Sequence, residues 1–337
     1  MRENVVSTPT RKRAITSYAA RTQYKAEPVR ALSVKVKDAI DIHCHAHDGQ
    51  QDADALARRA SMAEMKGLLF KSIVGSDPVA ATRRLQDDVD RWAESEGIAP
   101  ITCWPGFVCG RQREPLSAKA AEAAVAAGAV AVWLPVFTHA NTLHTVGTYR
   151  RLVEGRDDVK GWTGPLSWDD ALKYGRYLLG GDGKLSAETR AIVRMCADRN
   201  AALFFGHATH DEMYRLADEV VRVGLKRTVI DHPFSPFIDL SVEQMKELST
   251  AGILFNFTCD ELSPLLGVDP QLMYDAIRAV GVEHCTLSSD AGEPLFPDSV
   301  EAMRLVRAYM EAFGMNQEEL YTLCTRNPAK VVGLELT

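Results

Sequence analysis

Residues 39–45 read AIDIHCH, a short apolar run that ends in two histidines separated by one residue. Side chains two residues apart on a β-strand point to the same face, so His43 and His45 share one face and Cys44 points to the other. Two imidazoles on one face can bind one metal ion together. This stretch therefore predicts a strand that carries a pair of metal ligands at its end.

Three further potential ligands follow later apolar runs: His207 after LFFG, His232 after TVID and Asp290 after LSS. A single histidine is more often a core or surface residue than a ligand. Five residues that each end an apolar run are hard to attribute to chance, and imidazole with carboxylate suits several divalent ions. We therefore predict a metal site of these five residues. It would hold one or two ions per chain, with zinc preferred and iron or manganese as alternatives.

From residue 38 onward, short apolar runs alternate with longer stretches of helical periodicity, which is the pattern of repeated βα units. We expect strands at 39–43, 67–74, 101–108, 129–136, 201–207, 227–231, 252–257 and 284–288. We expect helices at 52–65, 78–96, 117–127, 186–200, 211–223, 241–250, 270–280 and 299–313. This succession predicts an α/β fold, a (β/α)8 TIM barrel, whose active site lies at the carboxyl ends of the strands. All the nominated ligands lie there.

The segment 137–184, between the fourth strand and its helix, is long and irregular and contains the runs GWTGP and GGDG. Loops of this length usually form a functional lid or an insertion. Because the segment leaves the catalytic face, we expect a lid that shapes the substrate pocket. A surface elaboration without substrate contact is the alternative. The other expected specificity element is the loop after strand seven, residues 258–269.

Charge is distributed unevenly along the 337 residues. Residues 1–37 carry 9 Lys or Arg against 2 Glu, a net charge of +7, which leaves −13 for the rest of a chain whose total is −6. We expect residues 1–37 to be a basic N-terminal extension and residues 38–337 to be the barrel. The acidic body argues against nucleic acid as a partner. A small-molecule substrate and a second copy of the chain in a homodimer are the expected partners. We expect the extension either to pack against a partner subunit or to be disordered.

No apolar run approaches the length of a membrane helix, and the N-terminus lacks the apolar core of a signal peptide. We therefore expect no membrane partner and a cytoplasmic location. The 7 cysteines, an odd number without a repeated spacing, agree with reduced thiols in the cytosol better than with a disulfide framework.

The order of the nominated ligands resembles that of the amidohydrolase superfamily of metal-dependent hydrolases. In that superfamily a His-x-His ends strand one, single histidines end strands five and six, and an Asp ends strand eight. The resemblance covers about residues 38–335. It implies that a metal-activated water cleaves an amide, lactone, ester or thioester bond of a small molecule. It also implies that Asp290 exchanges protons and that His232 either binds metal or polarises the substrate carbonyl.

The chain departs from the superfamily pattern at strand four, where residues 130–138 read VAVWLPVFT and contain no Lys or Glu to bridge two metals. Lys71, in the run GLLFKS, resembles the lysine that ends strand two in a poorly characterised branch of the superfamily. We count Lys71 as a catalytic-site candidate. It either bridges two metals as a carboxylated lysine, contacts an anionic substrate or lies at the surface.

Two other hypotheses stay open at this point. A barrel of this kind can use its metal for non-oxidative decarboxylation or hydration, and a binding protein can retain a vestigial metal site.

For the surrounding residues, we expect Asp231 to face away from the site, because it precedes His232 on a strand. Several aromatic residues are candidates either for a pocket lining or for the core: Trp133, Phe137, Trp162, Phe234, Phe237 and Phe257.

Overall fold

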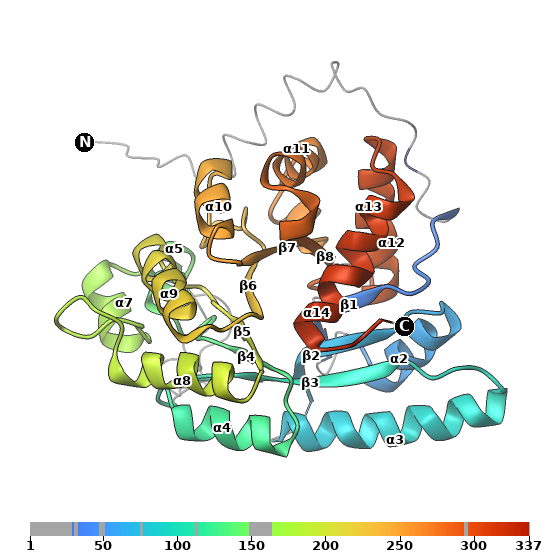
Figure 1. Cartoon of the computed structure of the whole chain (residues 1–337), viewed down its shortest axis with the longest axis horizontal. Coiled ribbons are helices and arrows are strands. Elements are labelled where there is room, and N and C mark those ends of the chain that lie inside the picture. The colour runs from blue at the N-terminus through green and yellow to red at the C-terminus, as the bar shows by residue number, and fades with distance from the viewer. Residues whose placement is uncertain are drawn as a thin grey trace.

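The computed structural model describes residues 29, 33–46, 51–74, 77–111, 114–147, 164–292 and 296–336. Eight strands form one sheet in chain order, and each strand pairs in parallel with the next. The strands are β1 (Ile40–Ala46), β2 (Gly67–Ile73), β3 (Thr102–Val108), β4 (Ala131–Trp133), β5 (Ala202–Phe204), β6 (Thr228–Asp231), β7 (Leu254–Thr258) and β8 (Cys285–Ser288). Figure 1 shows the helices outside this sheet. The prediction of a (β/α)8 barrel is confirmed.

Most helices return the chain from one strand to the next and form the outer layer, and the last helices follow the eighth strand. Their bounds are α2 (Ala53–Met62), α3 (Pro78–Glu96), α4 (Ala118–Ala127), α5 (Ala140–Thr145), α7 (Trp168–Tyr174), α8 (Ala187–Asp198), α9 (His210–Val223), α10 (Val242–Ser249), α11 (Pro270–Val280), α12 (Ser299–Ala312), α13 (Gln317–Tyr321) and α14 (Asn327–Val332). The connecting helices begin at Asp, Ser or Thr side chains that accept a backbone N–H of the first turn, as Ser241 does for α10. Short sequence-local rules therefore place the helix starts.

The core has two parts, separated by the wall of the barrel. Inside the barrel, Ile42, Leu69 and Trp133 pack with residues of the later strands, and Ala329 and Val331 of α14 join them. Outside it, alternate strand residues pack against the helices. Burial of both faces explains why the strands read as nearly continuous apolar runs.

A bulge in β1 decides where its histidines point. Asp41 pairs with Leu68 and Cys44 with Phe70, so three steps along β1 match two along β2. Strict alternation would put Cys44 on the same face as Ile42. Instead Ile42 lies in the interior cluster and Cys44 in the outer one. The extra residue therefore turns His43 and His45 inward above the apolar interior.

The barrel closes between β8 and β1 by an isolated parallel bridge from Cys44 to Ala291. The His45 N–H donates to Ala291 O at 3.0 Å, and the Asp290 N–H donates to His43 O at 2.9 Å. These two bonds join the His-x-His segment directly to the segment that carries Asp290.

The predicted extension lies mostly outside the described residues. Of its described part, Val34 and Val36 are buried, and Arg304 of α12 donates to Val34 O at 3.1 Å. The division at residue 37 stays a prediction.

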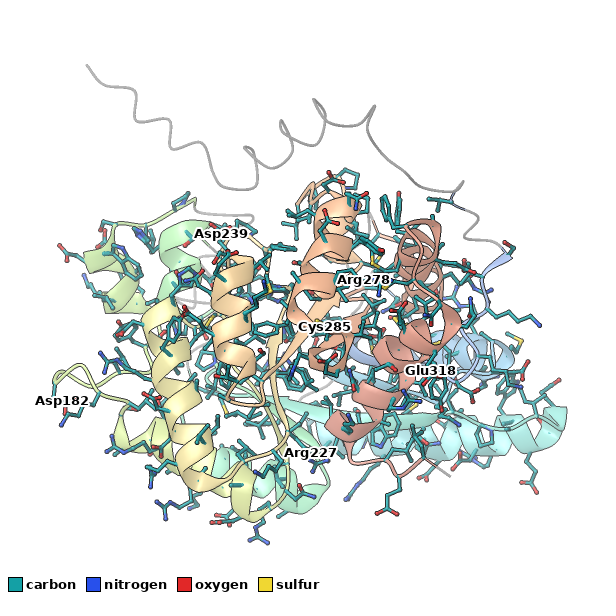
Figure 2. All side chains as sticks on the ribbon, turned by 45° about the horizontal axis from the view of Figure 1, so that its top comes forward. Asp182, Arg227, Asp239, Arg278, Cys285 and Glu318 are labelled. Carbon is teal, nitrogen blue, oxygen red and sulfur yellow. The ribbon has the colours of Figure 1, made fainter. Side chains whose placement is uncertain are left out.

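In Figure 2 the labelled Asp182 marks a peripheral loop, whereas Cys285 lies within the body of the barrel. Among the described residues, no helix combines the length and apolar character needed to cross a membrane.

Candidate metal centre

Three of the predicted ligands converge on one carboxylate. Asp290 Oδ1 lies 3.1 Å from His43 Nε2 and 3.1 Å from His45 Nε2, and Asp290 Oδ2 lies 3.9 Å from His232 Nε2. Donor atoms of His43, His45 and Asp290 all lie within 4.8 Å of one another. The His207 ring centroid lies 5.2 Å from that of His232, so the fifth predicted ligand borders the group without belonging to the tight set.

Each of the four histidines has its Nδ1 atom occupied by a neighbouring oxygen. His43 Nδ1 faces Asp231 Oδ1 at 3.0 Å, and the hydroxyl partners of the other three are Ser72 for His45 at 2.6 Å, Thr142 for His207 at 2.7 Å and Ser235 for His232 at 3.0 Å. Such outer contacts fix ring orientation and leave Nε2 for a metal. Both ring nitrogens of His43 are buried and lie within 3.1 Å of a carboxylate oxygen, but neither has the geometry of a hydrogen bond to a described residue. These features fit a divalent cation.

Asp231 contradicts our expectation, because its side chain faces the site. Its carboxylate lies against His43 and accepts hydrogen bonds from Trp133 Nε1 and Asn256 Nδ2, both at 2.8 Å. Burial alone would raise the pKa of Asp231, but His43, together with His232 and Lys71, holds that pKa well below its usual range. Asp231 thus positions His43 rather than turning away from it.

Backbone geometry explains why Asp231 and His232 can both face the site. His232 has φ of 34°, which is left-handed backbone that a residue other than glycine rarely adopts. This turn breaks the strand alternation directly after Asp231. Asp290 also has a positive φ, of 49°. Two potential ligands therefore hold strained conformations, which often accompany functional sites.

Burial sets the protonation states of the site. It lowers the pKa of His45 to about 3 and that of His232 to about 4, and it holds the pKa of His207 well below its usual range. Burial alone would raise the pKa of Asp290, but His43 and a hydrogen bond from His45 hold it well below its usual range. These directions favour neutral imidazoles at His45, His207 and His232 and an ionised carboxylate at Asp290, the forms that bind divalent cations.

The segment expected to form a lid reaches the site through α5. Thr142 Oγ1 lies 3.0 Å from Val136 O, which only accepts, so the hydroxyl proton goes there and Thr142 accepts the Nδ1 proton of His207. Asn141 Nδ2 donates to His207 O at 3.2 Å. Residues 148–163 of the segment, including Trp162, lie outside the described residues, and its action as a lid stays a prediction.

Replacing Thr142 by valine is expected to weaken metal binding by roughly 10- to 100-fold, because the isosteric side chain no longer orients His207. Titration calorimetry with a competing chelator measures the affinity. Thr142→Ser keeps the hydroxyl and serves as the matched control, with affinity close to that of the original protein. Equal affinity in both variants would exclude His207 from the metal site.

Lys71 faces the same space from β2. The β1–β2 register shifts between Phe70 and Ser72, so alternation alone does not fix the direction of Lys71. Its charge acts on Asp231 and Asp290, which shows that the side chain lies close to them. It is 5 % exposed. Its charge contributes, after burial, to the lowered pKa of His45, His207 and His232. The strand-two lysine therefore lies close to the predicted ligands.

The aromatic candidates divide between core and site. Trp133 lies beneath the site, stacked on Phe204 at 4.0 Å, and Phe234 and Phe257 are buried core residues. Phe237 stacks on His207 at 4.0 Å between ring centroids, and Phe137 meets the same ring edge-on at 5.8 Å. Phe137 and Phe237 thus form an aromatic wall beside His207.

Sequence reasoning missed a buried network at the β8–β1 seam. Asp41 accepts hydrogen bonds from the N–H of His43 and the N–H of Ser289, both at 3.1 Å. Gln51 Nε2 donates to His45 O at 2.6 Å and to Ala291 O at 3.2 Å. The network holds the His-x-His segment against Asp290. The only sequence signal for this network is that Asp41 and Gln51 are polar residues beside apolar runs.

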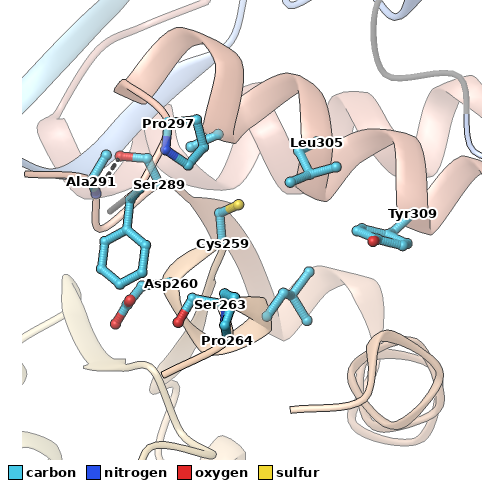
Figure 3. Close-up of a pocket in the computed structure, with 12 residues that line it drawn as sticks. Cys259, Asp260, Ser263, Pro264, Ser289, Ala291, Pro297, Leu305 and Tyr309 are labelled. Atoms are coloured by element: carbon cyan, nitrogen blue, oxygen red, sulfur yellow. Dashed lines mark hydrogen bonds between the residues drawn. The ribbon is translucent and has the colours of Figure 1, made fainter. Parts of the chain in front are cut away.

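A separate cavity of about 110 Å³ lies between the turn after β7 and helix α12 (Figure 3). Cys259, Asp260 and Ser263 come from the predicted specificity loop, and Ser289 and Ala291 flank Asp290 in the chain. None of the predicted metal ligands lines it. The cavity therefore adjoins the turn that carries Asp290 without opening onto the ligand side chains.

Comparison with known protein families assigns the chain to one of them. Residues 38–256 match a family of unknown function, DUF6282. The chain belongs to the DUF6282 family. No curated protein matches this DUF6282 sequence.

Solved structures share the fold of this DUF6282 protein. An amidohydrolase from Pseudomonas aeruginosa superposes with a TM-score of 0.55 at 13% identity, covering 90% of this chain and 98% of its own. A candidate 2-pyrone-4,6-dicarboxylic acid hydrolase from Pseudomonas putida gives 0.52 at 16% identity, with 89% and 99% covered. An amidohydrolase from Burkholderia multivorans gives 0.53 at 13% identity, with 88% and 99% covered. The predicted likeness to the amidohydrolase superfamily is thus confirmed for the fold.

Proposed function

We propose that this protein is a metal-dependent hydrolase that cleaves an amide, lactone, ester or thioester bond of a small molecule. The observation that carries the proposal is the convergence of histidine Nε2 atoms on Asp290, with every Nδ1 atom held by an outer oxygen. A purely structural cluster needs no such uniform orientation. The amidohydrolase-type barrel supports the same reading, because active sites of such barrels lie at this end.

The proposed roles follow from position. His43, His45 and Asp290 would hold the ion, and His207 and His232 complete the ligand set or bind a second ion. A divalent ion held there supplies Lewis-acid chemistry, which polarises a carbonyl and makes water more acidic. Asp290 lies among the ligands and takes a proton from the attacking water, then returns it to the leaving group. Asp231 orients His43, and Phe137 and Phe237 bound the space beside His207.

Metal content tests the first part of the proposal. Protein produced with added zinc, iron and manganese and purified without chelators is expected to contain metal when measured by plasma mass spectrometry, with zinc the expected ion. About one ion per chain supports the tight set of His43, His45 and Asp290, and about two bring in His207 and His232. Protein that retains no metal under any of these conditions would refute the hydrolase.

Hydrolysis itself is tested with isotopically labelled water. Incubation with a panel of lactones, esters and amides in ¹⁸O-water is expected to place solvent oxygen in the acid product, read by mass spectrometry. Chelator should abolish turnover, and added metal should restore it. Release of CO₂ from a carboxylate substrate without solvent oxygen in the organic product would instead identify the decarboxylase of the alternative hypothesis.

We also propose the cytoplasm as the location. All seven cysteines are free and buried, which agrees with a reducing compartment. The homodimer and the small-molecule substrate remain predictions, which size-exclusion chromatography with light scattering and substrate screening address.

A further inference from the structure

We propose that Lys71 binds a carboxylate group of the substrate, so that the proposed hydrolase acts on small anionic molecules with a flat apolar body. This inference rests on the proposed function and specifies its substrate class. It assigns to Lys71 the anion contact rather than the metal bridge or a place at the surface.

The burial of the Lys71 ammonium group requires an explanation. An ammonium group that is removed from water costs several kcal/mol unless a partner of opposite charge compensates it. Lys71 is 5 % exposed, and it forms no ion pair and no hydrogen bond with any residue that the structure describes. The other buried charged groups nearby are already engaged. Asp231 is occupied by Trp133 and Asn256, and Asp290 by the histidines.

The described carboxylates leave room for a further anion at Lys71. The Lys71 charge acts on Asp231 and Asp290, but neither carboxylate forms an ion pair with Lys71, and both contact other side chains. A substrate carboxylate that reaches Lys71 supplies the hydrogen bonds and the opposite charge that a buried ammonium group requires.

The shape of the substrate follows from the aromatic wall. Phe237 is fixed by stacking on His207, whereas Phe137 is 39% exposed at the same ring. An exposed aromatic face beside a metal centre suits a flat, unsaturated body. The carboxylate would then lie on the Lys71 side and the ring on the side of Phe137 and Phe237.

Binding of benzoate to the metal-loaded protein tests this inference without requiring turnover. Titration calorimetry and ligand-observed NMR are expected to show that benzoate binds and that neutral benzamide binds far more weakly. Lys71→Met keeps the length of the side chain and removes its charge. Loss of a hydrogen bond to a charged group is expected to weaken benzoate binding by roughly 10- to 100-fold in this variant.

Lys66→Met is the matched control. Lys66 precedes β2 at the opposite end of the barrel, pairs with Asp38 at 3.1 Å and is 36% exposed in its side chain. This variant should bind benzoate as the original protein does. Because Lys71→Met removes an unpaired buried charge, its ligand-free melting temperature should rise, and benzoate should then raise it less than in the original protein.

Three results would overturn the inference. Equal benzoate affinity in Lys71→Met, with the fold verified by circular dichroism, would show that the carboxylate binds elsewhere. A carbamate carbon in the ¹³C NMR spectrum of protein prepared with labelled bicarbonate would show that the Lys71 ammonium group has formed an N–C bond to CO₂, with release of two protons. Hydrolysis of anionic esters at unchanged kcat/KM in Lys71→Met would refute the anion contact while leaving the hydrolase intact. Benzoate binding without any hydrolysis would refute the hydrolase while leaving the anion contact intact.

Discussion

Replacement of His45 by alanine is expected to weaken metal binding by roughly 100-fold or more and to abolish turnover, because it removes one of the three donors that meet at Asp290. The side chain of His45 is 18% exposed, so its removal leaves no large closed cavity. The metal-free variant should therefore melt within a few degrees of the metal-free original protein. Metal content by plasma mass spectrometry and melting in chelator measure the two effects separately.

His43→Ala should behave differently, since that ring is fully buried and faces Asp231. Its removal leaves the Asp231 carboxylate without its imidazole partner, which costs about 3–5 kcal/mol of stability in addition to the metal. His284→Ala provides the control, because His284 directly precedes β8, at the end opposite to the predicted ligands. Undiminished metal stoichiometry in His45→Ala would defeat the site assignment.

Asp290→Asn is expected to lower kcat by roughly 10²- to 10⁴-fold, which is the range that a positioned proton acceptor contributes. Asparagine is nearly isosteric and tolerates positive φ, so the backbone at 49° should persist. The loss then reports the carboxylate rather than a collapsed turn. Steady-state kinetics on the substrate found by screening measure it, at metal concentrations that saturate the variant.

Asp239→Asn is a matched control for this substitution, since Asp239 also has a positive φ, of 46°. Its activity should stay close to that of the original protein. If Asp290→Asn, fully loaded with metal, retained the original kcat, then another group would have to accept the proton.

The fold could be predicted from the sequence to within a few residues at most strand positions. The prediction erred most at 129–136 and 201–207, where only Ala131–Trp133 and Ala202–Phe204 pair as strands. There the chain turns early, at Pro135 and at Gly206, whose φ is 60°. Apolar runs continue past the last paired residue because the carboxyl ends of these strands are still buried.

The candidate site could be predicted only in part. The five ligand candidates were found from their positions at strand ends, and the structure brings His43, His45, His232 and Asp290 within contact range of one another. The prediction for Asp231 was wrong because it assumed regular alternation through His232. The hydroxyls of Ser72, Thr142 and Ser235 could not be found, since hydroxyl residues are common and nothing local marks the few that meet a histidine.

The sequence by itself determined the order of strands and helices, the end of the barrel that carries the chemistry and the residue types available there. These properties depend on periodicity and on chain order, which are local. The tertiary structure alone decided that a bulge in β1 turns the His-x-His pair inward, that Asp231 supports His43, and that Lys71 is buried without an ion pair to any residue that the structure describes. Such properties arise from contacts between strands that are distant in the chain, where packing determines which atoms meet and which charges remain uncompensated.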